Sequence, residues 1–486
     1  MKDRFGNEIR AKEPLKEWSG LDWKTVRKRV RNLRRRIYRA KQNGQWNKVK
    51  SLMKLMLRSY SNLLLSVRRV TQLNQEQKKA GIDSQTVTNP SQRVELVREM
   101  LTYNLWQAKP ARKLYVPKVN GKQSPLGVSA VKNRVAQAIV KNALEPAWKQ
   151  VFESSSYGFP LARSCPDALE QSWIRLQKGM DRWVLNADIQ RAFDHISHKY
   201  ILKAIGKIPG RELIKNWLKA GYVEAEVFQE TKSGQPRGGI ISLLLANIAL
   251  DGMERLLAEA KTSTAYPCRK KAIGEKYPTK NKLGKYGLIR YANELIITAR
   301  NEKDIDAIIP TIQTWLSQRG LELNQEKTSA VHIEQGFNFL GFNIRQFKNS
   351  CLRVPQKEKI KEFLKEIRTW LKAHPTATQA AVITHLNPMI TEWRNYYRYG
   401  VRQQVFSYVD HEIWKSLWQW SLRRHSKRVG KQKGKGKEWV QKKYFKAING
   451  NKWTFAATIA NRHGEEETIT ICRLTKTPVT YKAAVL

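Results

Sequence analysis

A long segment near the start of the chain carries no acidic side chain. Between Trp23 and Gln75 there is neither aspartate nor glutamate, whereas lysine and arginine crowd the first half of the segment. Its apolar residues recur at spacings of three and four, at Val26, Val30, Leu33 and Ile37. Such spacing gives a helix one apolar face, and the rest of this helix is mostly basic. A polar turn at 43–46 precedes a second apolar run, so we expect a basic helical hairpin.

The basic face of this hairpin limits its possible partners. A solvated charged face usually mixes both signs, because opposite charges on neighbouring turns stabilise a helix. Here no carboxylate is available, so an external polyanion has to neutralise the cations. We expect RNA or DNA to bind this face, through Lys28, Arg31, Arg34, Arg35 and Arg36.

The whole chain shows the same imbalance. Its 486 residues include 90 lysines and arginines against 41 aspartates and glutamates, a formal net charge of +49. A compact chain with this excess repels itself unless a polyanion binds it, and nucleic acid is the leading candidate. A membrane surface is the weaker alternative, because no apolar run approaches 20 residues and the basic start MKDRFGNEIR is not a signal peptide. We expect an intracellular protein with no membrane partner.

The four cysteines lie far apart in the sequence, at Cys165, Cys268, Cys351 and Cys472. No two of them have the short spacing of a structural zinc site. A disulfide framework is equally unexpected in an intracellular chain of this size. We therefore expect isolated reduced thiols.

Turn signals and apolar patterns divide the remaining chain. Residues 72–95 are polar and predict a linker, and Lys113–Val128 predicts a β-hairpin around Asn120-Gly121. Arg182–Ser197 predicts a buried strand ending in Asp188, followed by a helix. The other expected elements are helices near 211–220, 243–257 and 305–319, a strand pair near 222–232, a basic insertion over 261–285, a strand over 337–344, helices over 357–424, a flexible basic linker over 426–443 and a small sheet in the last fifty residues.

A second hairpin is expected at Arg290–Ala299, RYANELIITA, with a polar tip at Asn293-Glu294. Polymerases that use two metal ions bring carboxylates from separate strands together, because the ions lie about 4 Å apart and bridge the nucleotide phosphates. A strand ending in Asp188 beside the tip of a hairpin fits that arrangement. The pattern alone is only moderately specific, since strands often end in aspartate at turns.

Six blocks in order resemble the motifs of a group II intron reverse transcriptase. They are SYGFPLARSCPDAL (Ser156–Leu169), ADIQRAFDHISH (Ala187–His198), QPRGGIISLLLANIAL (Gln235–Leu250), RYANELIITA, LNQEKTSA (Leu323–Ala330) and FLGF (Phe339–Phe342). Further on, LNPMITEWRNYYRYG (Leu386–Gly400) and WSLRRHSKR (Trp420–Arg428) resemble the family's maturase thumb, and KKYFKAINGNKWTFAA (Lys442–Ala457) resembles its DNA-binding region. The resemblance covers nearly the whole chain.

This resemblance implies an α+β fold with right-hand reverse transcriptase fingers and palm. The implied segments are a basic N-terminal helical extension (1–90), fingers and palm (91–350), a helical thumb or maturase domain (351–429), and a basic linker with a DNA-binding-like tail (430–486). The implied partners are the intron's own RNA, which requires Mg²⁺, and target DNA. The expected setting is a cytoplasmic ribonucleoprotein, bacterial or organellar. The family's nuclease module has no counterpart in this sequence, so we expect no endonuclease activity.

The catalytic positions depart from the family's pattern. Asp188 is kept, but the family's acidic pair is Asn293 and Glu294 here, so only Asp188 and Glu294 remain as charged metal ligands. Mg²⁺ relies on charged oxygens in near-octahedral geometry, and a misplacement of about 1 Å can cost about a hundredfold in rate. We therefore expect Mg²⁺ binding at the palm to be weak or lost.

The nucleotide pocket departs as well. Ser124 stands where the resemblance implies an arginine contacting the triphosphate, which removes a charge-assisted anchor. Arg237 replaces a glutamine of the pocket with a bulky cation, and Leu243 replaces a proline in the same helix entry. Phe193 is kept at the position whose ring excludes a 2′-hydroxyl, although we expect it to persist as part of the core.

Aromatic and basic residues interleave in the thumb-like segment. We expect Trp393 and its neighbouring tyrosines to pack in the core, while the arginines reach a phosphate backbone. The expected RNA-binding residues of this segment are Arg394, Arg398, Arg423, Arg424 and Lys427.

Three functions compete. The first is a maturase that binds its intron RNA and promotes splicing and reverse splicing into DNA through phosphate and shape contacts. The second is an active RNA-directed DNA polymerase, in which Asp188 and Glu294 still hold metal. The third, a basic architectural protein unrelated to introns, leaves the palm blocks unexplained. The tip Asn293-Glu294 favours the first.

Overall fold

The computed structural model describes residues 15–476 apart from 16, 75–78, 103–107, 118–122, 159–162, 225–226, 232, 235–238, 261–283, 349, 401–402, 426–432, 449 and 461–464. The chain divides into two compact units. The first comprises residues 1–168 and 183–330, and the second comprises residues 169–182 and 331–486. No helix within the described ranges combines the length and the apolar character needed to cross a bilayer.

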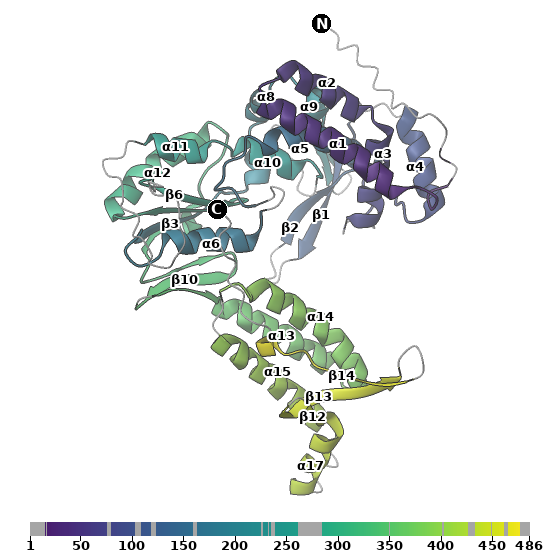
Figure 1. The fold of residues 1–486 in the computed structure, drawn as a ribbon, viewed down its shortest axis with the longest axis vertical. Coiled ribbons are helices and arrows are strands. Elements are labelled where there is room, and N and C mark those ends of the chain that lie inside the picture. Colours follow the sequence, from purple (N-terminus) through teal and green to yellow (C-terminus); the bar gives the residue numbers. More distant parts are fainter. Residues whose placement is uncertain are drawn as a thin grey trace. The chain divides into compact units, whose positions relative to one another are not determined.

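The first unit begins with the expected basic helices (Figure 1). α1 (Trp23–Gln42) starts after Asp22, whose carboxylate accepts hydrogen bonds from two backbone N–H groups of the first turn. Its apolar face packs against α2 (Trp46–Leu57), α3 (Tyr60–Arg68) and α5 (Val131–Lys149). The second helix of the predicted hairpin is thus two helices, because the chain breaks at Arg58-Ser59 and the Ser59 hydroxyl caps α3. A short π-helix, Arg69–Leu73, continues α3.

A helix also begins inside the segment predicted to be a linker. α4 spans Pro90–Thr102, so that prediction is wrong from residue 90 onward. The start is stabilised by a reciprocal pair: Gln92 N–H donates to Asn89 Oδ1 at 2.8 Å, and Asn89 N–H donates to Gln92 Oε1 at 3.3 Å. Proline fits the first helical turn because its missing N–H has no partner there.

A four-stranded sheet follows in the order β2-β1-β4-β5. β1 (Ala111–Pro117) and β2 (Gln123–Val128) form the predicted antiparallel hairpin, whose turn at Asn120-Gly121 lies outside the described residues. β4 (Tyr222–Glu224) and β5 (Val227–Gln229) confirm the predicted strand pair.

A second four-stranded sheet carries the predicted catalytic strands in the order β6-β7-β3-β8. Its members are β3 (Trp183–Asp188), β6 (Gly287–Tyr291), β7 (Glu294–Ala299) and β8 (Ser329–His332). The helix α12 (Glu302–Ser317) packs on β3 and β7. The shorter helices of the first unit are α7 (Ala192–His195), α8 (His198–Ile205), α9 (Arg211–Lys219), α10 (Ser242–Ala249) and α11 (Met253–Glu259). A further helix, α6 (Cys165–Arg175), belongs to the second unit from residue 169 onward.

Two predicted elements are each divided in two. The long helix expected over 243–257 ends at Ala249 as α10 and resumes at Met253 as α11, because Gly252 between them adopts a φ of 104°. The single strand expected over 337–344 is a hairpin in the second unit. Its strands are β9 (Phe337–Phe339) and β10 (Phe342–Phe347), and the two turn residues between them both have positive φ.

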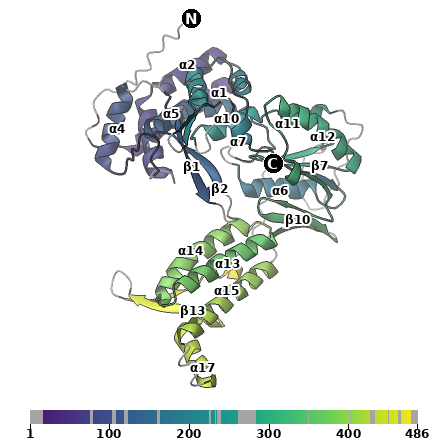
Figure 2. The same cartoon turned by 180° about the vertical axis from the view of Figure 1, so that it is seen from behind.

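The second unit continues with β11 (Ser350–Pro355), which completes the sheet β11-β10-β9. Three long helices then lie alongside one another (Figure 2): α13 (Lys357–Ala373), α14 (Gln379–Tyr397) and α15 (Gln403–Arg424). They confirm the helical run predicted over 357–424.

The last part of the chain holds a helix and a small sheet. α17 (Lys433–Tyr444) occupies part of the glycine-lysine stretch predicted to be a flexible linker, so that prediction is wrong there. β12 (Phe445–Ile448), β13 (Asn451–Ala460) and β14 (Glu466–Thr470) form the predicted small sheet, followed by a 3-10 turn, Leu474–Lys476. Cys165, Cys351 and Cys472 form no disulfide among the described residues, and Cys268 lies outside those residues.

Candidate nucleic-acid interface and the remnant palm site

The hairpin RYANELIITA forms as predicted, but its turn lies one residue earlier than expected. Tyr291 pairs with Glu294, so the turn consists of Ala292 and Asn293, and Glu294 is the first residue of β7. Ala292 has a φ of 56°, a conformation that a residue with a Cβ adopts only when its surroundings enforce it.

The residues that enforce the conformation of Ala292 lie at the start of the block SYGFPLARSCPDAL and immediately before it. Arg290 N–H donates to Ser155 O at 2.9 Å, and Tyr157 N–H donates to Arg290 O at 2.8 Å, so this segment pairs with β6. Gly158 then lies so close to the turn that a Cβ on it would be 2.2 Å from the backbone nitrogen of Ala292. Only glycine allows this approach.

Arg290 anchors the hairpin from inside the first unit. Its side chain is fully buried, donates to Ser156 Oγ at 2.7 Å and to Asn247 Oδ1 at 3.2 Å, and has neutral groups as its hydrogen-bond acceptors. Burial lowers the pKa of Arg290 to about 10, and the carboxylates of Glu153 and Asp251 oppose that shift. The arginine serves the shape of the hairpin rather than a bound anion.

Asp188 ends β3 and has both carboxylate oxygens in use. Asn293 Nδ2 donates to Oδ1, and Lys327 Nζ lies 3.0 Å from Oδ2. The side chain of Asp188 is 14% exposed. An amide and an ammonium group therefore contact the two oxygens that, in the site implied by the family resemblance, would bind metal ions.

The β3–β7 register brings Glu294 directly opposite Asp188, as the predicted metal pair requires. Glu294 is nevertheless exposed, and among the residues that the structure describes no three His, Cys, Asp or Glu side chains form a group able to hold a metal ion. Mg²⁺ needs several charged or polar oxygens that are free to turn toward it. The residues around Asp188 do not fit the two-metal site that the family resemblance implies.

Lys327 is the residue of this site that the sequence did not single out. It ends a short 3-10 turn, Gln325–Lys327, in the block LNQEKTSA. Asn324 N–H donates to Asp188 O at 2.8 Å, which draws that turn against the end of β3. Lys327 is 139 residues from Asp188 in the sequence, so no local pattern indicates the pair.

Of the three residues predicted to line the nucleotide pocket, only Phe193 has a side chain that the structure describes. Phe193 lies in α7, half-buried against the core of the first unit, as expected of a core residue. Ser124 pairs with Val116 in the β1–β2 register, but its side chain lies outside what the structure describes. Arg237 also lies outside the described residues.

The basic face of α1 is exposed at four of the five predicted contact residues, namely Lys28, Arg31, Arg35 and Arg36. The fifth, Arg34, is turned inward. Its Nη2 lies 2.5 Å from Glu145 Oε2 of α5, and both side chains are mostly buried. Arg34 thus holds α1 to α5, and the exposed cations around it form the available face.

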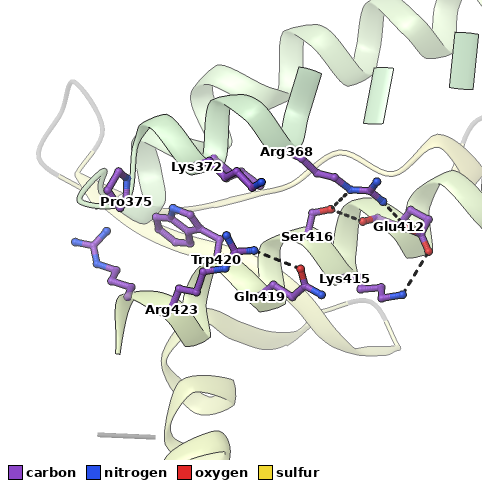
Figure 3. A pocket seen from close by; sticks show the side chains of 11 residues that line it. Arg368, Lys372, Pro375, Glu412, Lys415, Ser416, Gln419, Trp420 and Arg423 are labelled. Atoms are coloured by element: carbon purple, nitrogen blue, oxygen red, sulfur yellow. Dashed lines mark hydrogen bonds and ion pairs between the residues drawn. The ribbon is translucent and has the colours of Figure 1, made fainter. Parts of the chain in front are cut away.

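A pocket of about 530 Å³ lies between α13 and α15 (Figure 3). We call it the α13–α15 pocket. Glu412 on its wall forms ion pairs with Arg368 at 2.5 Å and Lys415 at 3.9 Å. Five cations line the pocket against this one carboxylate: Arg368, Lys372, Lys415, Arg423 and Arg424.

Arg423 and Arg424, both predicted to bind RNA, are therefore part of this pocket. Arg424 also donates to the carbonyl of Ala377 and lies over the ring of Trp420, which fixes its direction. Lys427 lies outside the described residues. The excess of cations over carboxylates makes the pocket suited to an anion such as a phosphate group.

Arg394 on α14 and Arg398, which follows the last residue of that helix, are half-buried rather than exposed. Their Nε atoms are buried without a hydrogen-bond partner among the described residues, and Arg398 Nη2 donates to Tyr399 Oη at 2.6 Å. Trp393 and Tyr397 are buried and lie stacked or tilted against Phe363 and Phe342, which confirms that these two belong to the core. The prediction is wrong for Tyr396, which is 43% exposed.

Comparison with known families gives three matches along the chain. Residues 116–344 match the reverse transcriptase (RNA-dependent DNA polymerase) family, and residues 18–100 match the N-terminal domain of reverse transcriptase. Residues 360–445 match the maturase-specific domain of group II introns. The three matches are in the order that the sequence motifs predict.

Individual relatives agree. Protein YkfC of Escherichia coli (strain K12) is 30% identical over 272 residues, covering 52% of this chain and 71% of that protein. The group II intron-encoded protein LtrA of Lactococcus lactis subsp. cremoris is 28% identical over 383 residues, 63% of each chain. Maturase-like protein 1 of Euglena gracilis is 22% identical over 393 residues, covering 78% of this chain and 77% of that protein. The chain therefore belongs to the group II intron-encoded reverse transcriptase and maturase family.

Proposed function

We propose that this protein is a maturase that binds its own group II intron RNA and promotes splicing and reverse splicing into DNA, with an impaired polymerase site. The state of Asp188 carries the proposal. Oδ1 accepts a hydrogen bond from Asn293 and Oδ2 forms an ion pair with Lys327, so both oxygens already have partners within the chain. A metal ion would have to displace both partners before it could bind this carboxylate.

Two basic surfaces support RNA as the partner. The exposed face of α1 carries Lys28, Arg31, Arg35 and Arg36, and α1 contains no acidic residue to compete for them. The α13–α15 pocket adds a concave site with excess positive charge. Folded RNA is recognised largely by its shape and phosphates, which surfaces of this kind can contact.

In this mechanism the RNA performs the chemistry and the protein holds the RNA in its active fold. Mg²⁺ is then required by the RNA partner rather than by the palm. The complex would act as a ribonucleoprotein in a bacterial or organellar compartment. Target DNA is a further proposed partner, because the segment Lys442–Ala457 resembles the family's DNA-binding region and forms the end of α17 with β12 and part of β13.

An active RNA-directed DNA polymerase is the second candidate, and one observation favours it. Asp188 and Glu294 are directly opposed in the β3–β7 register, so two carboxylates do start from neighbouring positions. For polymerisation both Asn293 and Lys327 would have to release Asp188, and Glu294 would have to turn toward it.

One preparation of the full-length protein decides between the two. Splicing of a precursor RNA that contains the intron is measured at a Mg²⁺ concentration where the RNA alone is inactive, and primer extension is measured on an RNA template. We expect splicing to be stimulated and extension to stay at background. Robust extension, or no stimulation of splicing, would overturn the proposal.

A further inference from the structure

A second cleft of the second unit lies between α15 and the C-terminal sheet. It encloses about 480 Å³ and is lined from α15, from β13 and from the segment that follows β14. We call it the tryptophan cleft, after Trp414 and Trp453 in its wall. Cavities that hold ligands the size of a nucleotide have volumes of a few hundred cubic ångströms. The cleft is separate from the α13–α15 pocket and shares no lining residue with it.

Flat ring faces dominate one side of the cleft. His411 stacks on Trp414 with ring centroids 6.0 Å apart and planes 23° apart. Trp453 stands edge-on to Trp414 at 5.9 Å and 84°, and 36% of Trp453 remains exposed. An exposed indole face beside a cleft is the surface on which an unpaired base stacks.

One residue of the cleft wall has a hydrogen-bond donor without an acceptor. The indole Nε1 of Trp414 is buried and has no acceptor among the described residues, although Trp414 lines the cleft. Buried N–H groups in native proteins are nearly always paired, so one without a partner beside an open cleft indicates an acceptor that comes from outside the chain. A nucleobase has carbonyl and ring-nitrogen acceptors on its edge.

One cation at the cleft is also suited to a nucleic-acid ligand. Asp410 is buried, and its carboxylate accepts from the backbone N–H groups of Leu474 and Thr475 at 2.8 and 3.1 Å, so it holds the 3-10 turn Leu474–Lys476 against α15. Arg473, whose side chain is 39% exposed, lies 4.0 Å from that carboxylate. The Arg473 guanidinium keeps donors available for a phosphate.

We propose that the tryptophan cleft binds an unpaired nucleobase of a single-stranded nucleic acid. The base stacks on Trp453, an edge acceptor receives the N–H of Trp414, and Arg473 contacts the adjoining phosphate. The inference rests on the proposed function and deepens it, because Trp453 lies in the segment Lys442–Ala457 already proposed to contact target DNA. It adds a base contact to the phosphate and shape contacts. The strand is either a single-stranded part of the intron RNA or an unpaired segment of target DNA, because both present the same base chemistry.

The test uses the full-length protein and fluorescein-labelled pentanucleotides. The probes are pentamers of A, C and U in RNA, the corresponding pentamers of A, C and T in DNA, and an abasic pentamer with the same number of phosphates. Binding is measured by fluorescence anisotropy at one fixed salt concentration, because phosphate contacts alone depend strongly on salt. The variants are Trp453→Ala, which removes the stacking face, and Trp414→Phe, which keeps a ring but removes the N–H.

The matched control is Trp418→Phe. Trp418 stacks on Trp414 with centroids 6.1 Å apart and planes 7° apart, but it does not line the cleft. If Trp414→Phe lost the base advantage only because the aromatic cluster had loosened, Trp418→Phe should lose it as well. Thermal unfolding of each variant shows whether the second unit is intact.

We expect at least one base-bearing pentamer to bind about tenfold more tightly than the abasic pentamer, the scale of one base stacked on an aromatic side chain. Trp453→Ala should abolish that advantage, Trp414→Phe should reduce it severalfold, and Trp418→Phe should keep it. Tighter binding of the RNA pentamers would identify the intron RNA as the source of the base, and tighter binding of the DNA pentamers would identify target DNA.

Equal binding of the abasic pentamer would overturn the inference, as would variants of Trp414 and Trp453 that keep the advantage. A loss of the advantage in Trp418→Phe equal to that in the two cleft variants would overturn it as well. This result and the splicing result are distinguishable, because a protein that fails to stimulate splicing can still show the base advantage. Conversely, splicing without a base advantage leaves the maturase proposal standing and removes only this cleft.

Discussion

The charged side chains of the palm site and of the basic face of α1 lie in opposite environments. At the palm, the Asp188 carboxylate that ends β3 accepts a hydrogen bond from Asn293 and forms an ion pair with Lys327. On α1, the cations at Lys28, Arg31 and Arg35 are exposed in a helix without acidic residues. A charged group that is satisfied internally contributes to the fold, whereas one left exposed and uncompensated is available to a partner. The proposed function follows this difference, with the palm serving the fold and the helix contacting RNA.

The same contrast appears between two adjacent residues. Arg34 forms a mostly buried ion pair with Glu145, and Arg35 is exposed one position further along α1. Both are arginines in a basic run, so the sequence treats them alike. Their environments separate a residue that stabilises the first unit from one that can contact a phosphate.

The prediction with the largest expected effect tests whether the palm hairpin contributes to the stability of the first unit. Gly158→Ala would place a Cβ 2.2 Å from the backbone nitrogen of Ala292, and backbone atoms cannot move aside as a flexible side chain can. We expect the free energy of unfolding of the first unit to fall by about 3 kcal/mol or more. Urea unfolding followed by circular dichroism measures this.

Gly284→Ala is the matched control, because its nearest neighbour would be Tyr286 O at an ordinary 3.7 Å. We expect that change to be within about 0.5 kcal/mol. If Gly158→Ala were as stable as wild type, the hairpin would not be held against the SYGF block, and the palm could not be described as a retained scaffold.

The second prediction tests the basic face of α1. The triple variant Lys28→Ala, Arg31→Ala, Arg35→Ala removes three exposed cations for which the described part of the chain provides no ion pair. We expect the affinity for the intron RNA to fall by about a hundredfold at moderate salt, and the slope of log affinity against log salt to decrease by about two to three. Filter binding over a salt series measures both.

Arg34→Ala sharpens this prediction. Loss of its ion pair should lower the free energy of unfolding by about 1 to 3 kcal/mol, with RNA affinity changed less than about twofold under conditions where the protein stays folded. The distinction between inward and exposed cations fails if Arg34→Ala weakens RNA binding as much as Arg35→Ala does.

The smallest expected effect concerns pH. His198 of α8 is about half-buried, with its Nε2 against the carbonyl oxygen of Gly234. Burial lowers the pKa of His198 below its ordinary value near 6.5; the Gly234 carbonyl opposes this shift, and Lys219 adds to it. The contribution of His198 to stability is therefore present above about pH 6.5 and is lost as the pH falls through its lowered pKa.

We expect His198→Gln to flatten the dependence of stability on pH between 7.5 and 5. The exposed His195, replaced in the same way, serves as the control. Urea midpoints across that range provide the comparison. A pH dependence unchanged by His198→Gln would show that other groups near the palm control acid sensitivity.

Local patterns predicted the elements that carry the site. The strand ending in Asp188 and the hairpin RYANELIITA follow from apolar runs bounded by polar turns, and both are present. The contacts that decide what the site does are not local. Lys327 reaches Asp188 only because its block docks at the end of β3, and Arg34 turns inward only because Glu145 of α5 lies beside it.

Where the structure divides a predicted element or adds a helix, contacts between residues distant in the sequence are again the cause. The turn at Leu340-Gly341 divides a continuous apolar pattern, and Tyr396 Oη donates to Leu340 O at 2.9 Å from 56 residues away. α17 forms in a glycine-lysine stretch because residues such as Trp439 and Tyr444 pack on His425. Tertiary packing outweighs weak helix propensity there, which no window of sequence reveals.

The most direct test of the central claim compares wild type with Asp188→Asn in both activities. The change keeps the size of the side chain and removes the charge that a polymerase would use. We predict equal stimulation of splicing by the two proteins, with primer extension at background in both. Primer extension by the wild type that disappears in Asp188→Asn would contradict this account and show that the palm still binds catalytic metal.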